Sequence, residues 1–112
     1  MLVAVYGTLK QGRSNHCVMQ RASGSFVGEA TLEGFEMYTN GGFPVIYKTN
    51  HDSTIAVELF SVEDIDPLDS LEGHPTWYRR EQVATPHGDA WIYIMQDESY
   101  KHSWTKLDKG VF

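Results

Sequence analysis

At 112 residues, the chain has the length of a single domain, which we expect to span residues 1–112. Hydrophobic residues make up 41% of the sequence and charged residues 21%, a composition that excludes a disordered polypeptide. The net charge of −6 argues against a nucleic-acid partner, because nucleic-acid binding calls for a basic surface.

The chain opens with an apolar segment, Leu2–Tyr6, that predicts a strand buried on both faces. It ends at Gly7, and a turn follows as far as Gly12. Because glycine has no Cβ, the main-chain N–H groups of this turn can approach a ligand closely. The alternative is an ordinary tight turn, since short glycine motifs also occur by chance.

A short helix is expected next, over Asn15–Ala22, with Ser14 and Asn15 as candidate capping residues. Arg13, Asn15 and His16 lie where their side chains could line the mouth of a site. Ordinary surface positions are the alternative for all three.

Extended segments separated by turns make up most of the middle of the chain. The strongest turn signal is Asn40-Gly41-Gly42, because two consecutive glycines can adopt positive φ. Pro44, just after it, predicts an edge strand or the start of a strand. We expect five or six strands, drawn from Leu2–Tyr6, Phe26–Leu32, Thr54–Val62, Trp77–Thr85, Ala90–Met95 and two shorter segments, Phe35–Tyr38 and Phe43–Tyr47.

The clearest helix signature ends at Glu72. Apolar residues at helical spacing include Leu68 and Leu71, Pro67 suits a first helical turn, and Gly73 suits the position after the last one. The tail, Gln96–Phe112, is expected to be irregular or partly helical. These elements predict an α+β fold: a small mixed, mostly antiparallel, barrel-like β-structure with one or two short helices.

Glu72 is the best acid–base candidate. At the end of a helix the macrodipole raises the pKa of a carboxyl group, and the aromatic pair Trp77-Tyr78 that follows would raise it further by desolvation. A general base that works near neutral pH needs such a pKa. The alternative is a solvated glutamate at a helix end.

Most other site types find no support in the sequence, although a catalytic Cys17–histidine pair stays open, with a small core residue as the alternative for Cys17. The five histidines include no closely spaced pair, and one cysteine, Cys17, can form neither a zinc ribbon nor an internal disulfide. Nucleotide-binding glycine motifs are missing, so we expect a site without metal or cofactor. No apolar run approaches the about 20 residues of a membrane span. We expect a cytoplasmic protein without a membrane partner, with a monomer as the favoured state.

Two motifs together resemble the gamma-glutamylcyclotransferase-like family, most closely its gamma-glutamylamine cyclotransferase type. They are Tyr6–Lys10 (YGTLK) and Leu68–Gly73 (LDSLEG), the second followed by Pro75 and Tyr78. Either motif alone is weak, whereas the pair in one short chain is specific. The resemblance extends over nearly the whole chain, including Gly28–Gly34, Val57–Phe60, Ala90–Tyr93 and the final Lys109–Phe112.

The resemblance implies a barrel-like fold with a cavity in which a gamma-glutamyl substrate is cyclised, releasing 5-oxoproline and a free amine. It assigns Glu72 as the catalytic acid–base and Tyr78 as an aromatic residue on the substrate side. The substrate-binding turn that it implies is formed by Tyr6, Gly7, Thr8 and Leu9.

Two non-enzymatic alternatives remain open from the sequence. The chain could be a non-catalytic protein that binds a small ligand in the same cavity. It could also be a partner-binding protein, which would rest on exposed aromatic residues such as Trp104 and Phe112.

Overall fold

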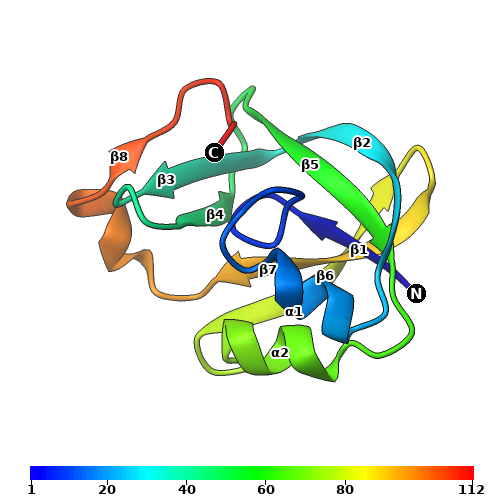
Figure 1. Cartoon of the computed structure of the whole chain (residues 1–112). Coiled ribbons are helices and arrows are strands. Elements are labelled where there is room, and N and C mark those ends of the chain that lie inside the picture. The colour runs from blue at the N-terminus through cyan, green and yellow to red at the C-terminus, as the bar shows by residue number, and fades with distance from the viewer.

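The computed structural model describes residues 1–112, which form two sheets, two α-helices and one 3₁₀ helix (Figure 1). Neighbouring strands are antiparallel, except for one parallel pair at the centre of the larger sheet. The elements in chain order are β1 (Leu2–Val5), α1 (His16–Arg21), β2 (Ser25–Glu33), β3 (Phe35–Thr39), β4 (Pro44–Lys48), β5 (Thr54–Ser61), α2 (Asp66–Glu72), β6 (Tyr78–Thr85), β7 (Gly88–Met95), η1 (Glu98–His102) and β8 (Thr105–Lys106).

Strand β1 is the centre of the five-stranded sheet, whose order is β2-β5-β1-β7-β6. It pairs antiparallel with β5 and parallel with β7. Val3 and Val5 point into one hydrophobic cluster and Ala4 into the other, and all three are buried. The expectation of an opening strand buried on both faces is therefore correct.

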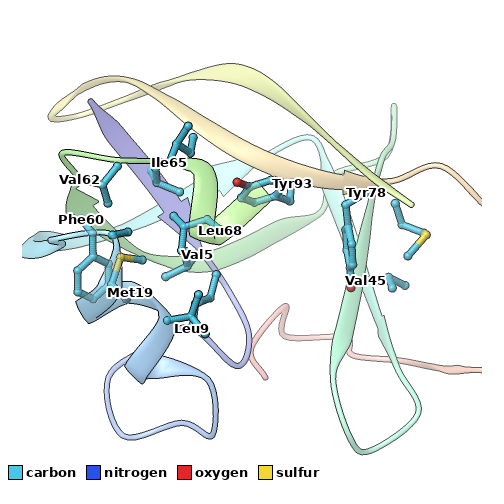
Figure 2. Packing of buried hydrophobic residues seen from close by; sticks show 14 of the residues in the cluster. Val5, Leu9, Met19, Val45, Phe60, Val62, Ile65, Leu68, Tyr78 and Tyr93 are labelled. Atoms are coloured by element: carbon cyan, nitrogen blue, oxygen red, sulfur yellow. The ribbon is translucent and has the colours of Figure 1, made fainter. Parts of the chain in front are cut away.

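One face of this sheet is covered by the helices. Leu68 of α2 and Met19 of α1 pack over Val5 and Phe60 of the sheet. Figure 1 shows α1 and α2 on the same side of the molecule, and Figure 2 shows their cluster, with Val5 and Leu68 near its middle. Neither helix is long and apolar enough to cross a lipid bilayer.

The other face packs against the second sheet, of order β4-β3-β8. Met37 of β3 and Ile46 of β4 share a buried cluster with Leu59 and Ile92 of the larger sheet. Side chains that alternate along a strand can serve two cores in this way. The central strand and the turn after it are thus fixed from both sides.

The expected α+β fold with mostly antiparallel strands and short helices is confirmed, but the expected five or six strands are too few. There are eight, because the shorter segments form a sheet of their own and the tail contributes β8. Strand β8 has only two residues, both exposed, so its local sequence carries no strand pattern. It is a strand because it pairs with Tyr38 and Thr39. The expected side-chain cap of α1 is also missing, and the hydrogen bond that the Asn15 amide nitrogen does make goes to Thr8 Oγ1.

Candidate active site

A cavity of about 220 Å³ opens where β1 ends. All six residues that the resemblance assigns to the site line this cavity, and they come from three segments far apart in the sequence. The turn after β1 forms one side, the C-terminal end of α2 another, and the start of β6 a third. Those residues are Tyr6, Gly7, Thr8, Leu9, Glu72 and Tyr78. Their roles in binding and catalysis stay predictions.

The turn after β1 is fixed by hydrogen bonds and by close packing. Asn15 donates to Thr8 twice, from its main-chain N–H to the carbonyl oxygen at 2.9 Å and from its amide to Oγ1 at 3.0 Å. A Cβ at Gly7 would lie 2.7 Å from Cγ of Pro44, so this close approach requires glycine.

Three consecutive N–H groups of this turn remain available to a ligand. Those of Gly7, Thr8 and Leu9 donate to no acceptor within the chain. Neighbouring main-chain donors in a turn form a concave site for an anion or a carbonyl oxygen. This side of the cavity can therefore bind negative charge without a basic side chain.

Glu72 reaches the cavity because α2 ends directly after it. Gly73 adopts the left-handed conformation, with φ of +64°, and the His74 N–H donates to the Asp69 carbonyl oxygen at 3.0 Å, which closes the helix. Burial raises the pKa of Glu72 from its ordinary value of 4.5 to about 7. At this pKa the group can both accept and return a proton near neutral pH.

Three tyrosines surround Glu72, and each hydroxyl already donates a hydrogen bond. Tyr6 donates to the carbonyl oxygen of Tyr93 at 2.6 Å, and Tyr78 to that of Pro44 at 2.9 Å. The third, Tyr93, donates to Asp69 Oδ1 at 2.7 Å. Burial raises the pKa of all three hydroxyls, and the nearby charge of Glu72 adds to the effect. These tyrosines thus shape the cavity as neutral rings with anchored hydroxyls.

Of the three residues proposed for the mouth of the site, the structure brings one to the cavity, Asn15. The Arg13 guanidinium instead donates to the Phe112 carbonyl oxygen at 2.8 Å. His16 Nδ1 lies 2.9 Å from the Leu9 carbonyl oxygen, so this ring supports the turn from outside. A turn that folds back on itself does not direct successive side chains to one side.

Sequence reasoning missed several residues that line the cavity. Phe43 enters it from the loop before β4, Pro44 from the first position of β4, and Tyr93 from β7. The signal for the loop was present, since an aromatic residue directly follows the strongest turn of the chain. Tyr93 lies within a segment that carries the family resemblance, although no role follows from that segment alone.

Charged groups are scarce in the cavity. Glu72 is the one charged side chain among the sixteen lining residues, and neither lysine nor arginine is present there. No group of three or more histidine, cysteine or acidic residues that could hold a metal ion occurs in the structure. The arrangement offers proton transfer by one carboxyl group in a cavity that main-chain donors also line.

The fold and cavity thus define a small α+β protein in which a single carboxyl group and a turn with three unpaired N–H groups line one cavity. A family model described as gamma-glutamyl cyclotransferase, AIG2-like, matches residues 3–110. The chain belongs to this gamma-glutamylcyclotransferase family.

Curated relatives and solved structures are similar to this chain over most of its length. A candidate gamma-glutamylcyclotransferase from Vibrio cholerae is 38% identical over 111 residues, covering 97% of this chain and 92% of the relative. The crystal structure of an uncharacterised Pyrococcus horikoshii protein has a TM-score of 0.80 at 25% identity, over 100% of this chain and 89% of the other. An AIG2-like protein from Mus musculus shares the fold, with a TM-score of 0.76 at 23% identity over 96% of this chain and 85% of the other.

Proposed function

We propose that this protein is a gamma-glutamylcyclotransferase that converts a gamma-glutamyl amine or peptide into 5-oxoproline and a free amine. The observation that carries the proposal is the position of Glu72, whose pKa is raised to about 7, on the same cavity as the donor-rich turn Gly7–Leu9. Family membership supports this class of reaction. The motif pattern is most similar to the gamma-glutamylamine type, which we propose as the branch.

The chemistry is an intramolecular displacement at the γ-carbonyl carbon. The substrate's α-ammonium first gives a proton to the Glu72 carboxylate, because only the free amine is a nucleophile. The amine then attacks the γ-carbonyl, a five-membered lactam forms, and the bond to the leaving nitrogen breaks. Glu72 returns its proton to the leaving nitrogen, and the second proton of the attacking nitrogen follows the same route. The products are the lactam and an ammonium ion, with no net gain or loss of protons.

The turn supplies the electrostatic part of this mechanism. Its three unpaired N–H groups can bind the oxyanion that develops on the γ-carbonyl oxygen, or the substrate's α-carboxylate. Loss of one donor of this kind typically costs about 3 kcal/mol of transition-state stabilisation. Since ring closure is intramolecular, the enclosed cavity also acts by holding the substrate in its folded conformer.

Replacement of Glu72 tests the proposal. We expect Glu72→Gln to lower 5-oxoproline release from gamma-glutamyl compounds at least about a hundredfold, because the amide can no longer accept the proton. The assay measures 5-oxoproline directly, and circular dichroism verifies that the variant is folded. Glu63→Gln is the matched control, since Glu63 is exposed and does not line the cavity.

The assay also separates the two main interpretations of the site. An unchanged rate of 5-oxoproline release in Glu72→Gln would rule out an acid–base role for this residue. Thermal stabilisation of the native protein by gamma-glutamyl compounds, with no 5-oxoproline formed, would instead identify a ligand-binding protein that does not catalyse the reaction.

A further inference from the structure

An aromatic rim, formed by Phe43 and Trp77, lies at the opening of the cavity. Both residues line the cavity, and their rings pack edge to face with centroids 5.6 Å apart. Trp77 is 38% exposed, and among the five large exposed apolar residues it is the one that lines the cavity. A large apolar side chain left partly in water beside a cavity is typical of a surface that contacts a ligand.

The loop that carries Phe43 is held in place without a ligand. Asn40 Oδ1 accepts hydrogen bonds from the N–H groups of Gly42 and Phe43, at 2.9 and 3.2 Å. Thr39 Oγ1 donates to the Phe43 carbonyl oxygen at 2.9 Å. The ring itself packs against Trp104, with centroids 5.2 Å apart and an interplanar angle of 80°. Phe43 is therefore held by its own loop and by Trp104 as well as by Trp77.

Trp77 is fixed by the turn that follows Glu72. Its main-chain N–H donates to the Gly73 carbonyl oxygen at 2.9 Å, and its ring packs against that of Tyr78 with centroids 5.0 Å apart. A Cβ at Gly73 would lie 3.1 Å from the Trp77 Cβ, so the chain at the helix end lies close to the base of this side chain. Because both halves of the rim are ordered in advance, little free energy is lost in ordering them around a substrate.

The charges of a gamma-glutamyl group would have their partners among other residues of the same cavity. Its α-amine and α-carboxylate are matched by Glu72 and by the donors of Gly7–Leu9, while the rim offers two aromatic rings. The cavity, at about 220 Å³, is smaller than pockets that enclose drug-sized ligands, roughly 300 Å³ or more. With the glutamyl group inside, the leaving group has to extend along the rim.

We infer that the rim of Phe43 and Trp77 selects gamma-glutamyl substrates whose leaving amine carries an apolar, uncharged side chain, aromatic or branched aliphatic. This inference rests on the proposed function and names its substrate class. A charged side chain on the leaving group would lose water at the rim without gaining a partner, because the one charged residue of the cavity, Glu72, serves the reacting amine.

A panel of five gamma-glutamyl dipeptides tests this inference, with phenylalanine, leucine, alanine, lysine or glutamate as the second residue. The bond that breaks is the same in all five, so differences in kcat/KM for 5-oxoproline release report on the side chain. We expect phenylalanine and leucine to exceed the other three by about tenfold. In Trp77→Ala and Phe43→Ala the ratio of phenylalanine to alanine should fall toward one, and Trp77→Phe should restore part of it.

Phe26→Ala is the matched control, because Phe26 is an exposed aromatic residue that does not line the cavity. This variant should keep the ratio of the native protein. Equal rates for phenylalanine and alanine, a preference for lysine or glutamate, or an unchanged ratio in Trp77→Ala would each overturn the inference.

Failure of the proposed function gives a different result. If neither these dipeptides nor simple gamma-glutamyl amines yield 5-oxoproline, the proposed reaction is wrong, and isothermal titration of the dipeptides then tests the rim alone. Tighter binding of the phenylalanine dipeptide, lost in Trp77→Ala, would support the rim as a ligand surface. Equal affinity for all five dipeptides, or no binding, would overturn it.

Discussion

Burial of the Glu72 carboxyl group destabilises the folded state at neutral and alkaline pH. Its pKa is raised from 4.5 to about 7 by burial, so the folded protein holds the proton of this group more tightly than the unfolded chain does. The free energy of unfolding therefore decreases as the pH rises from 4.5 to about 7. An ordinary surface glutamate carries no such penalty, and a protein without use for a buried carboxyl group would gain stability by replacing it.

Glu72→Gln should accordingly stabilise the protein in alkaline solution while it removes activity. Relative to the native protein, we expect a gain of up to about 3 kcal/mol in the free energy of unfolding at about pH 8, and little gain at about pH 4, where the native group is neutral in both states. Urea unfolding at the two pH values measures both differences. If the difference in the free energy of unfolding between the two proteins were the same at both pH values, Glu72 would be solvated and its pKa would not be raised by burial.

The matched control for this experiment is Glu81→Gln, whose effect has the opposite sign. Hydrogen bonds from Lys48 and Arg79 lower the pKa of Glu81, so this group contributes stability above its ordinary pKa and loses it as the pH falls. Its replacement should destabilise the protein at about pH 8 and less so at about pH 4. The opposite signs of the two changes in stability distinguish desolvation from ion pairing as the cause of each pKa shift.

Helix α2 owes its position at the cavity to Asp69, one turn before Glu72. Arg80 Nε of β6 donates to both carboxylate oxygens of Asp69, at 3.0 and 3.3 Å, and the Tyr93 hydroxyl of β7 donates to Oδ1. The Arg80 guanidinium also lies over the Trp91 ring, 4.4 Å from its centroid. One carboxylate thus joins a short helix to two strands, which a helix of this length needs because its own hydrogen bonds stabilise it little.

Asp69→Asn should loosen this attachment. We expect it to lower the free energy of unfolding by about 1 to 2 kcal/mol, since the amide keeps an acceptor for Tyr93 but loses the charge that pairs with Arg80. Cyclotransferase activity should decrease about tenfold through the displaced Glu72. Urea unfolding and 5-oxoproline release measure the two effects. Asp66→Asn, on the same helix but exposed, is the control, and an equal loss in both variants would contradict a special role for Asp69.

At the scale of elements, the sequence predicted what depends on local pattern. The strands of the larger sheet, helix α2 with its end at Gly73, and the edge position of β4 all follow from periodicity, glycine and proline. The two-residue strand β8 and the organisation of the smaller strands into a separate sheet depend on partners distant in sequence. Propensity cannot show a pairing that tertiary contacts decide.

The cavity was predictable to a similar degree. Its two motif segments could be read from the chain, because each has a distinctive residue pattern. The rim could not, since Phe43 and Trp77 meet only when the loop before β4 reaches the turn after α2. Residues contributed by separate elements become a site through the packing of the whole molecule, and a single sequence does not show that packing.

At the scale of the whole molecule, the C-terminal tail connects the two sheets. The Leu107 N–H donates to the Met37 carbonyl oxygen of β3 at 2.8 Å, and the Ala56 N–H of β5 donates to the Gly110 carbonyl oxygen at 2.9 Å. Leu107 and Phe112 also pack against the cluster between the sheets. The tail is polar in composition, yet its main chain bridges one strand of each sheet.

The bridge depends on Gly110, where substitution should therefore destabilise the entire fold. Gly110 has a φ of +63°, and a Cβ there would lie 1.9 Å from the Thr54 carbonyl oxygen, a main-chain atom that cannot move aside without breaking β5. We expect Gly110→Ala to lower the free energy of unfolding by more than about 2 kcal/mol, measured by urea unfolding.

Gly12→Ala isolates the cost of positive φ, because Gly12 has a φ of +77° with no atom within 4 Å of its Cβ position. That control should lose about 1 kcal/mol. Equal losses in the two variants would mean that the tail is free to move away from β5, and that the sheets hold together without it.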